Sequence, residues 1–466
     1  MKEKALAALI IASCVVSPRA RAVDLIAIGT ISGTYEDFAA ETSDLLENGV
    51  PGNRLGGIGS GITYLGGTTF LALPDRGPNA SPYDPLVDDT TSYIPRIQTL
   101  NLSLAPSRDP VTGLPFTLTP MLLDTTLLSS PLPLVYGTGA GLGLGSGKPA
   151  LNNVNHTNYF SGRSDNFEPG LPSTDPRDGR IDPEGIRVSN NGQSVFLSDE
   201  YGPYMYEFDR TTGKRIRSIK LPANLAITKL SAQKDVEIAD NTVGRVTNKG
   251  MEGLAITPDG KTLVGIVQAN LEQDKKGSLR IVTVDLRGGQ AHEYAYKLTD
   301  GSGVSEILAV NNHQFLVDER DGTGLGDTPL LTDTASAAKI KKLYLIDITG
   351  AVDVTGVTGP AADLTPYAVP KKEFLNIVAK LNAAGINSLL IPSKMEGITF
   401  GPDVLINGVV KHTLYLANDN DFLATVADPF TKPTVPTRGS ILNPNQIYVF
   451  AFGDEELPGY VPQPLQ

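Results

Sequence analysis

The chain has 466 residues, of which 40% are hydrophobic and 19% are charged, and it contains 48 Gly, 34 Pro and no Trp. This composition is typical of a globular protein, and the abundance of Gly and Pro favours many strands and turns over long helices. The formal net charge of −12 argues against nucleic acids and anionic membrane surfaces as partners.

The N-terminus predicts export. The basic start MKEK is followed by the apolar run ALAALIIASCVV and by the cleavage motif Ala20-Arg21-Ala22. This order is typical of a signal peptide over residues 1–22 that is cleaved after Ala22, and the apolar run is too short to span a bilayer. We therefore expect a secreted or periplasmic protein without a membrane span. A lipoprotein is the alternative, because Ile11-Ala12-Ser13-Cys14 resembles a lipobox.

Cys14 is the only cysteine, so a chain that begins after Ala22 has neither thiols nor disulfides. Stability in an oxidising compartment must then come from core burial or from bound ions.

Short segments with alternating or β-branched residues recur along the rest of the chain, separated by turn signals such as NNG and PDG. Helical periodicity is clear only at residues 371–385, so we expect an all-β protein with one short helix. The predicted strands are, in order, DLIAIGTI, GITYL, TTFLAL, EGIRVS, SVFLS, EGLAIT, TLVGIV, LRIVTVDL, EILAV, FLVDE, KLYLIDI, EGITF, HTLYLA and QIYVFAF.

Similar hairpins recur among these strands. EGIRVSNNGQSVFLSDE (184–200) aligns without a gap on EGLAITPDGKTLVGIVQ (252–268), with Glu on Glu and turn Gly192 on turn Gly260. Residues 396–421 repeat the plan with a longer turn, and weaker copies begin near residues 60 and 305. The interval from 60 to 184 is twice the others, which predicts one degenerate copy between about 95 and 145.

Six such units predict a six-bladed β-propeller of four-stranded antiparallel blades, with residues 23–466 as a single domain. VDLIAIGTI has no hairpin partner of its own, and we expect it to join the blade of the last strand, NQIYVFAF, and close the ring. The Gly-rich stretch around residues 137–180 fits neither a P-loop nor a dinucleotide-binding motif, so we expect a surface insertion.

The hairpins place acidic residues at one mouth of the propeller. An antiparallel hairpin returns to the end where it began, so Glu184 and the pair Asp199-Glu200 lie at the same end of one blade. Radial repetition gathers the other hairpin acids there, and so many carboxylates require a counter-charge. The candidate metal ligands are Asp75, Glu184, Asp199, Glu200, Glu252, Glu319, Glu396, Asp419 and Asp421.

Ca²⁺ is the expected cofactor, because it prefers oxygen ligands. The absence of Cys beyond residue 14 and only four dispersed His argue against zinc and copper. Arg76 and Arg320 fall at the same mouth, and guanidinium groups bind phosphate or carboxylate in two-pronged fashion, which indicates a small anionic substrate.

A purely structural explanation of the repeated Glu-Gly pairs stays open at this point. The Gly can serve a positive φ or a close backbone approach, and the Glu can cap backbone N–H groups. No G-x-S-x-G and no H-E-x-x-H motif occurs, which argues against common serine and zinc hydrolases.

These segments resemble the phytase-like ("esterase-like activity of phytase") family of exported bacterial proteins. The matching motifs run from about residue 55 to 450 and include GGIGSGITYLGGTTFLALPDRGPN, DPEGIRVSNNGQSVFLSDEYGP, NKGMEGLAITPDGKTLVGIV and KMEGITFGP. The resemblance implies a propeller fold and kinship to calcium-dependent phosphoester hydrolysis. The residues that fall on the family's motif positions are Asp75, Arg76, Glu184, Asp199, Glu200, Glu252, Glu319, Arg320 and Glu396.

We therefore expect a monomeric, Ca²⁺-dependent phosphoester hydrolase that uses a metal-activated water. Glu184, Glu252 and Glu396 would be ligands or the general base, and Arg76 and Arg320 would stabilise phosphoryl oxygens. Basic residues near the mouth are few, which favours a simple phosphate ester over phytate. The alternatives are a carboxylester or lactone hydrolase on the same propeller, and a non-catalytic, ligand-binding propeller of the cell envelope with a structural ion.

Overall fold

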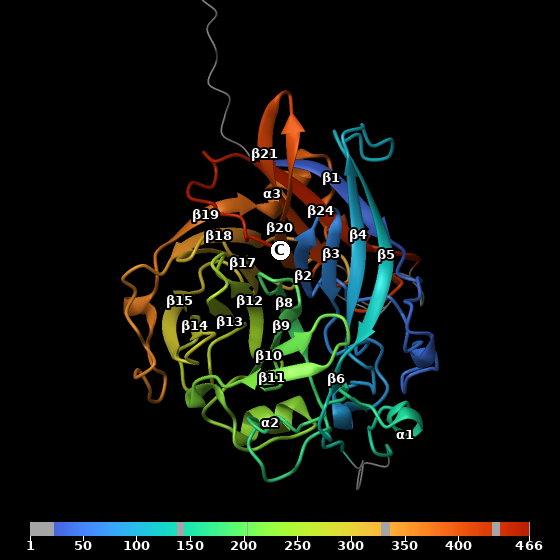
Figure 1. Cartoon of the computed structure of the whole chain (residues 1–466), viewed down its shortest axis with the longest axis vertical. Helices are drawn as coiled ribbons and strands as arrows, with labels where there is room; N and C mark the ends of the chain where they lie inside the picture. The colour runs from blue at the N-terminus through green and yellow to red at the C-terminus, as the bar shows by residue number, and fades with distance from the viewer. Residues whose placement is uncertain (1–22, 138–143, 203, 328–335, 431–438, 466) are drawn as a thin grey trace, which may run out of the picture.

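Five four-stranded antiparallel sheets surround a central axis in the computed structural model (Figure 1). The structure describes residues 23–137, 144–202, 204–327, 336–430 and 439–465. Each sheet is one blade of a β-propeller. The predicted all-β propeller with four-stranded blades is confirmed, but the predicted number of six blades is wrong, since the described residues form five. The predicted signal peptide, with Cys14, lies outside the described residues.

The blades follow one another along the chain, and the strands of each blade run in order from the axis outward. Blade 1 consists of β2 (Gly61–Gly66), β3 (Thr69–Leu73), β4 (Arg96–Ala105) and β5 (Thr117–Leu127). Blade 2 consists of β8 (Pro183–Val188), β9 (Ser194–Asp199), β10 (Tyr204–Asp209) and β11 (Arg215–Ile219). Blade 3 consists of β12 (Met251–Ile256), β13 (Thr262–Val267), β14 (Ser278–Asp285) and β15 (Ala291–Lys297).

Blades 4 and 5 complete the ring. Blade 4 consists of β16 (Gly303–Ala309), β17 (Gln314–Arg320), β18 (Lys341–Asp347) and β19 (Lys371–Asn376). Blade 5 consists of β20 (Met395–Ile406), β21 (Val409–Asn418), β24 (Asn445–Phe452) and β1 (Asp24–Ile31). The predicted ring closure is confirmed, because β1 pairs antiparallel with β24 from Asp24 opposite Ala451 to Ile31 opposite Asn445.

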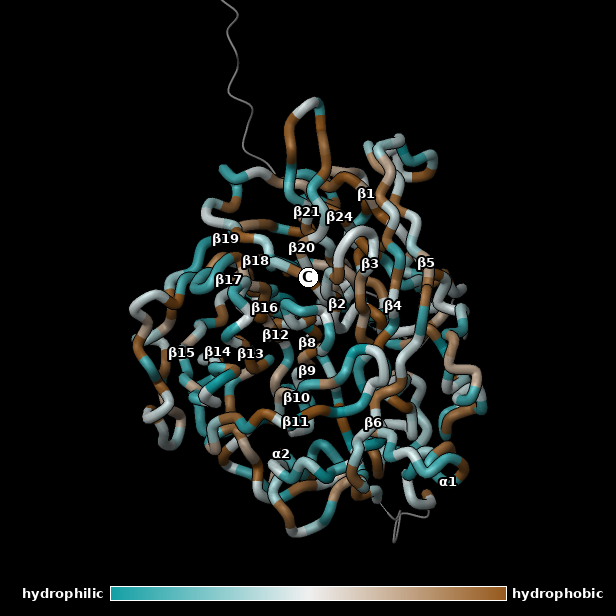
Figure 2. Tube along the Cα trace, viewed as in Figure 1, coloured by the Kyte–Doolittle hydropathy of each residue, from teal (hydrophilic) through white to brown (hydrophobic). Residues whose placement is uncertain are grey.

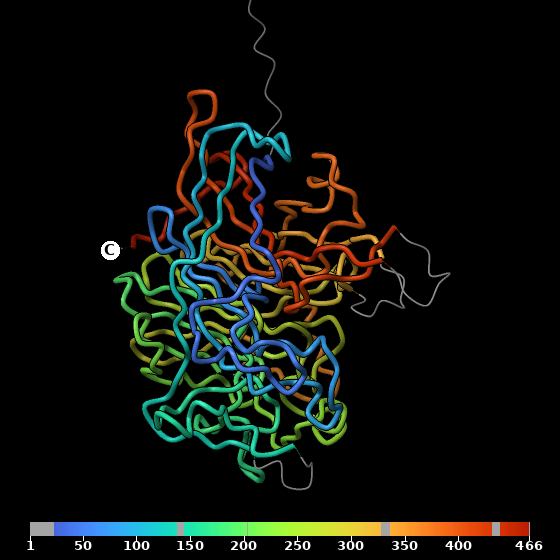
Figure 3. The backbone as a smooth tube through the Cα atoms, turned by 90° about the vertical axis from the view of Figure 1, so that its right-hand side faces the viewer, coloured from blue at the N-terminus to red at the C-terminus, as the bar shows by residue number. Residues whose placement is uncertain are grey.

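The long interval between the first two hairpins holds the outer half of blade 1 in place of a sixth blade. Strands β4 and β5 have 10 and 11 residues and form a hairpin that pairs back on β3. This hairpin and the β20–β21 hairpin project on the same side of the molecule (Figures 1 and 3). The doubled spacing therefore arises from long outer strands and from the segment that follows them.

The segment between β5 and β8 contains the two-stranded ladder of β6 (Ser129–Ser130) with β7 (Asn158–Tyr159) and helix α1 (Asn152–Asn155). Its residues Phe160 and Arg180 are buried, so parts of it pack into the protein. A second two-stranded ladder, of β22 (Thr425–Ala427) with β23 (Ser440–Leu442), lies between β21 and β24.

Only half of the predicted helix at residues 371–385 is helical. Lys371–Asn376 forms β19 because it pairs with β18, and α3 covers Ile377–Ala383. The Asn376 side chain accepts a hydrogen bond from Ala379 N and so caps the start of the helix. Helix α2 (Lys234–Asp240) and α1 were not predicted. Among the described residues, no helix is long and apolar enough to cross a membrane.

The hydrophobic core lies between neighbouring blades. The five largest clusters of buried apolar residues each combine residues of two adjacent blades, for example Ile266 of blade 3 with Val317 of blade 4. Apolar segments accordingly recur along the strands of all five blades (Figure 2). The ring is thus held together by sheet-on-sheet packing around the whole circle.

One buried ion pair lies at the centre of the ring. Arg187, on β8, forms an ion pair with Glu306, on β16, at 3.0 Å, and both side chains are almost fully buried. Arg187 also donates hydrogen bonds to the carbonyls of Ile62, Ile186, Ile307 and Ile398, and Glu306 accepts one from Leu254 N at 2.8 Å. These backbone partners belong to all five innermost strands, so the pair connects every blade.

Arg187→Met should destabilise the protein strongly. The variant leaves Glu306 buried without a counter-charge and removes the donors of several buried carbonyls, which costs about 3–5 kcal/mol for a broken buried pair. Denaturant unfolding followed by circular dichroism measures the loss. The matched control is Arg217→Met, which breaks a surface pair with Glu207 whose arginine side chain is 45% exposed and should cost about 1 kcal/mol or less. Equal losses in the two variants would contradict a central role of Arg187.

Candidate metal centre at one mouth of the propeller

A polar cavity of ≈ 320 Å³ lies at the mouth where the innermost strands begin. All five predicted catalytic residues line it, together with three of the other predicted metal ligands. The lining acids are Asp75, Glu184, Glu200, Glu252, Glu396 and Asp421, and the remaining lining residues are Arg76, Arg320, Lys394, Asn79, Asn248 and Gln268.

β-bulges at the start of the innermost strands hold the three repeated glutamates. The pairing register shifts between Pro183 and Ile186, between Met251 and Gly253, and between Met395 and Ile398. Glu184, Glu252 and Glu396 lie within these irregularities and are therefore not constrained by regular strand alternation. The bulge lets each carboxylate face the cavity although the strand behind it packs into the core.

The glycine after each glutamate is required by close packing. A Cβ on Gly185 would lie 2.7 Å from Leu254 N, and one on Gly253 would lie 2.6 Å from Ile307 N, both in the next innermost strand. Gly397 faces Gly59 O in the same way. None of these three glycines has a positive φ. Of the two structural explanations that the sequence left open for the Gly, close approach is therefore the correct one.

Three predicted ligands lie outside the cavity lining. Asp199 Oδ1 accepts hydrogen bonds from the backbone N–H groups of Asp182 and Tyr201, at 2.9 and 3.0 Å. Asp419 contacts Lys394 Nζ at 2.6 Å. Glu319 contacts Lys371 Nζ at 2.5 Å, because successive strand residues point to opposite faces and only its neighbour Arg320 faces the cavity.

The cations of the cavity are already paired with acids. Arg320 donates a hydrogen bond to Glu396 Oε1. Lys394 Nζ lies 2.6 Å from Asp421 Oδ1 as well as from Asp419. On the opposite side, Arg76 Nη1 lies 3.2 Å from Asp182 Oδ2. Each acid of blade 5 thus has a cationic partner, although Asp419 and Asp421 share Lys394.

The acids of blades 2 and 3 are not neutralised. Ligand oxygens of Glu184, Glu200 and Glu252 all lie within 4.8 Å of one another. Glu200 Oε1 and Glu252 Oε2 are buried and have no hydrogen-bond partner among the described residues. Burial, and then the charge of Asp182, raise the pKa of Glu200 to about 7. Burial and the neighbouring Glu200 raise the pKa of Glu252 well above its usual range.

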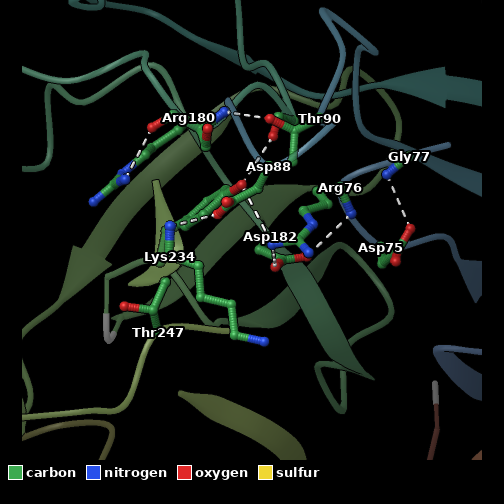
Figure 4. Close-up of polar contacts among 12 residues, drawn as sticks. Asp75, Arg76, Gly77, Asp88, Thr90, Arg180, Asp182, Lys234 and Thr247 are labelled. Atoms are coloured by element: carbon green, nitrogen blue, oxygen red, sulfur yellow. Dashed lines mark hydrogen bonds and ion pairs between the residues drawn. The ribbon is translucent and has the colours of Figure 1, made fainter. Parts of the chain in front are cut away.

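A buried polar network supports Arg76 from behind. The Arg76 guanidinium lies 3.5 Å from the Tyr201 hydroxyl, and Arg180 stacks on the Tyr201 ring at 4.7 Å. Glu237, on α2, binds Arg180 at 3.3 Å and Arg245 at 2.9 Å. Figure 4 shows Arg76 joined to Asp182 by a dashed line. Helix α2 and the segment before β8 thus fix the position of this cavity arginine.

A strained turn places Asp421 in the cavity. Asp421 and Phe422 have φ values of 51° and 56°, which non-glycine residues rarely adopt. Phe422 is buried and packs edge-on against Tyr93, with ring centroids 5.1 Å apart. This packing offsets the strain and holds the turn at the mouth.

The sequence analysis missed Asp182 and Lys394. Asp182 stands two residues before Glu184, and Lys394 stands two residues before Glu396, so both occupy the same place in the hairpin frame. The recurrence of a charged residue at this place was the available signal. The pattern is incomplete, because the residue two positions before Glu252 is Gly250 and has no charge.

Comparisons with known proteins show a family match and one curated relative. A sequence model of the family described as "Phytase-like: Esterase-like activity of phytase" matches residues 53–422. An uncharacterized secreted protein of Arthroderma benhamiae is 30% identical over 335 residues, which cover 58% of this chain and 60% of that relative. The chain thus spans less than two thirds of the length of that protein.

Solved structures are only distantly similar. The periplasmic gluconolactonase of Pseudomonas aeruginosa is 12% identical with a TM-score of 0.31, over 92% of this chain and 99% of that one. A putative 6-phosphogluconolactonase of Bacteroides uniformis is 11% identical with a TM-score of 0.29, over 89% and 98%. The residues matched by the family model include every acid that lines the cavity. Because this match covers residues 53–422, most of the chain, the chain belongs to the phytase-like family.

Proposed function

We propose that this protein is an exported, Ca²⁺-dependent hydrolase of small phosphoesters, with the ion held by Glu184, Glu200 and Glu252. The observation that carries the proposal is the close group of these three carboxylates, of which two have buried oxygens without a hydrogen-bond partner among the described residues. Such oxygens are costly unless a cation or a proton compensates them. Export is supported by the signal peptide read from residues 1–22 and by the name of the secreted relative.

The ligand set fits a hard divalent cation. All candidate donors in this group are carboxylate oxygens, which Ca²⁺ prefers over nitrogen or sulfur. Asn248 and Gln268 line the same cavity and offer amide oxygens. When bound, the ion would polarise a phosphoryl oxygen and lower the pKa of a bound water.

The remaining cavity residues have separate tasks in this proposal. Glu396 is fixed by Arg320 and takes a proton from the attacking water. Arg320 donates hydrogen bonds from Nε to the Ser305 hydroxyl and from Nη2 to Glu396. Its Nη1 is then the group that binds a phosphoryl oxygen. Arg76, held by Asp182 and Tyr201, faces the same cavity from blade 1. Because all three cavity cations are paired, a simple phosphate ester suits the site better than a polyphosphate.

Purified protein should hydrolyse p-nitrophenyl phosphate with Ca²⁺ and lose this activity in EDTA. Arg320→Gln should lower kcat by about 100-fold, as expected for loss of one group that stabilises developing charge. Bis-p-nitrophenyl phosphate and p-nitrophenyl acetate are assayed in parallel, because the family description names an esterase-like activity. Turnover of the acetate alone would replace the proposal by a carboxylester or lactone hydrolase, and no turnover of any substrate would favour a binding protein.

Glu252→Gln should stabilise the protein in the absence of metal. The substitution keeps the shape of the side chain and removes one of three mutually repelling carboxylates, so we expect Tm in EDTA at pH 8 to rise by about 2 °C. The rise in Tm that Ca²⁺ causes should shrink. The matched control is Glu396→Gln, which leaves Arg320 without its carboxylate and should lower Tm. A Glu252→Gln variant that melts below the wild type and keeps the full Ca²⁺ effect would exclude this group as the metal site.

Ca²⁺ affinity should rise with pH. The pKa of Glu200 is about 7 without metal, so below this pH its carboxyl holds a proton that Ca²⁺ must displace. The dissociation constant should therefore fall as the pH is raised from about 5.5 to 8. Isothermal titration calorimetry in two buffers of different ionisation enthalpy counts the released protons, and Glu200→Gln should release fewer at pH 6.5. An affinity independent of pH would contradict a role of Glu200 as ligand.

A further inference from the structure

Glu184 belongs to a second group of carboxylates. Ligand oxygens of Asp75, Asp182 and Glu184 lie within 4.8 Å of one another, as do those of Glu184, Glu200 and Glu252. The first group lies where blades 1 and 2 meet, because Asp75 follows β3 and Asp182 precedes β8. The second group lies where blades 2 and 3 meet. Glu184 is thus shared by two neighbouring groups of acids.

Unused carboxylate oxygens point to a ligand in the first group as well. Asp75 is only 8% exposed and lines the cavity. Its Oδ1 accepts a hydrogen bond from Gly77 N, while its Oδ2 has no such partner among the described residues. The Glu184 side chain likewise makes no hydrogen bond or ion pair with any described residue. Figure 4 shows Asp75 and Asp182 on either side of Arg76 in this view. Among the described residues, Arg76 is the one cation that forms an ion pair within this group.

The charges of the two groups match two divalent cations. Together they comprise five carboxylates, and Arg76 is the one cation paired within them, so the net charge is −4 when all are ionised. A single Ca²⁺ would leave half of this charge uncompensated in a largely buried site. The acids of blade 5 add only one further negative charge, because Arg320 balances Glu396 and Lys394 is shared by Asp419 and Asp421.

We propose that the cavity binds two divalent cations, one in each group, with Glu184 shared between them. This inference rests on the metal site of the proposed function and adds a second site to it. The ion at Glu200 and Glu252 binds more tightly, since neither acid forms an ion pair with a described residue and both have a buried oxygen without a hydrogen-bond partner. The ion at Asp75 and Asp182 binds more weakly, because Asp182 already forms an ion pair with Arg76.

A second cation also defines the substrate class. Two neighbouring cations can bind both the attacking and the leaving oxygen of a phosphoryl group, and this arrangement suits a phosphomonoester dianion. All three basic residues of the cavity are paired with acids, so the protein has little positive charge of its own for the substrate. Two bound cations would supply that charge. The recognised ligand is thus a compact dianionic phosphate ester.

Calorimetric titration of the full chain with CaCl₂ at pH 8 tests the number of sites. We expect two binding steps and a total of two ions per chain. Asp75→Asn should abolish the weaker step and keep the tighter one, and Glu252→Gln should abolish the tighter step. Glu184→Gln should weaken both steps by at least about tenfold. Asp421→Asn is the matched control, because Asp421 lines the same cavity but is paired with Lys394, and it should keep both ions.

One ion per wild-type chain, or two ions in the correctly folded Asp75→Asn variant, would overturn the second site. Circular dichroism of each variant confirms its fold before titration. Phosphatase assays on the same samples separate this result from the proposed function. Two ions without hydrolysis would refute the proposed reaction and keep the second site, whereas Ca²⁺-dependent hydrolysis with one ion would refute the second site alone.

Discussion

The ion pair of Arg187 with Glu306 organises the whole ring. It binds backbone groups of all five innermost strands, so a single guanidinium and a single carboxylate join every blade at the axis. Burying either group alone would be costly, and the surrounding carbonyls accept hydrogen bonds from both terminal nitrogens of the guanidinium. The pair also divides the axis. The acidic cavity lies on one side, and a smaller cavity of ≈ 80 Å³, which Arg187 and residues 460–463 help to line, lies on the other.

The Glu-Gly pairs connect the fold to the site. Gly185 and Gly253 permit neighbouring innermost strands to approach more closely than any side chain allows. The bulge at the same place frees the preceding glutamate to face the cavity. Packing at the axis and the chemistry of the mouth therefore depend on adjacent residues. The structural explanation of the repeat therefore holds for its glycine, while its glutamate lines the cavity.

The distribution of charge divides the mouth into two halves. Blade 5 supplies its own counter-charge through Lys394, and Arg320 of blade 4 faces Glu396. Glu184, Glu200 and Glu252 of blades 2 and 3 form no ion pair with a described residue, and the buried oxygens of Glu200 and Glu252 are the reason to expect a cation. The three basic residues of the cavity are all paired with acids, so they leave little unpaired positive charge at the mouth.

Local sequence patterns were sufficient to predict the inner hairpin of each blade, the ring closure and the five cavity residues first named as catalytic, but they missed outer strands such as β4, β5, β10, β11 and β15. Alternation, turn glycines and the repeated hairpin frame are local signals, and they are independent of distant partners. The number of blades, in contrast, is visible only in the folded chain, because a long outer hairpin and an extra blade occupy the same length of sequence. The fold also separates Glu319 from Arg320, and Asp199 from Glu200, because strand alternation and backbone hydrogen bonds set side-chain direction residue by residue. Which acids are paired and which are left for a cation depends on contacts between blades, and no local pattern encodes these.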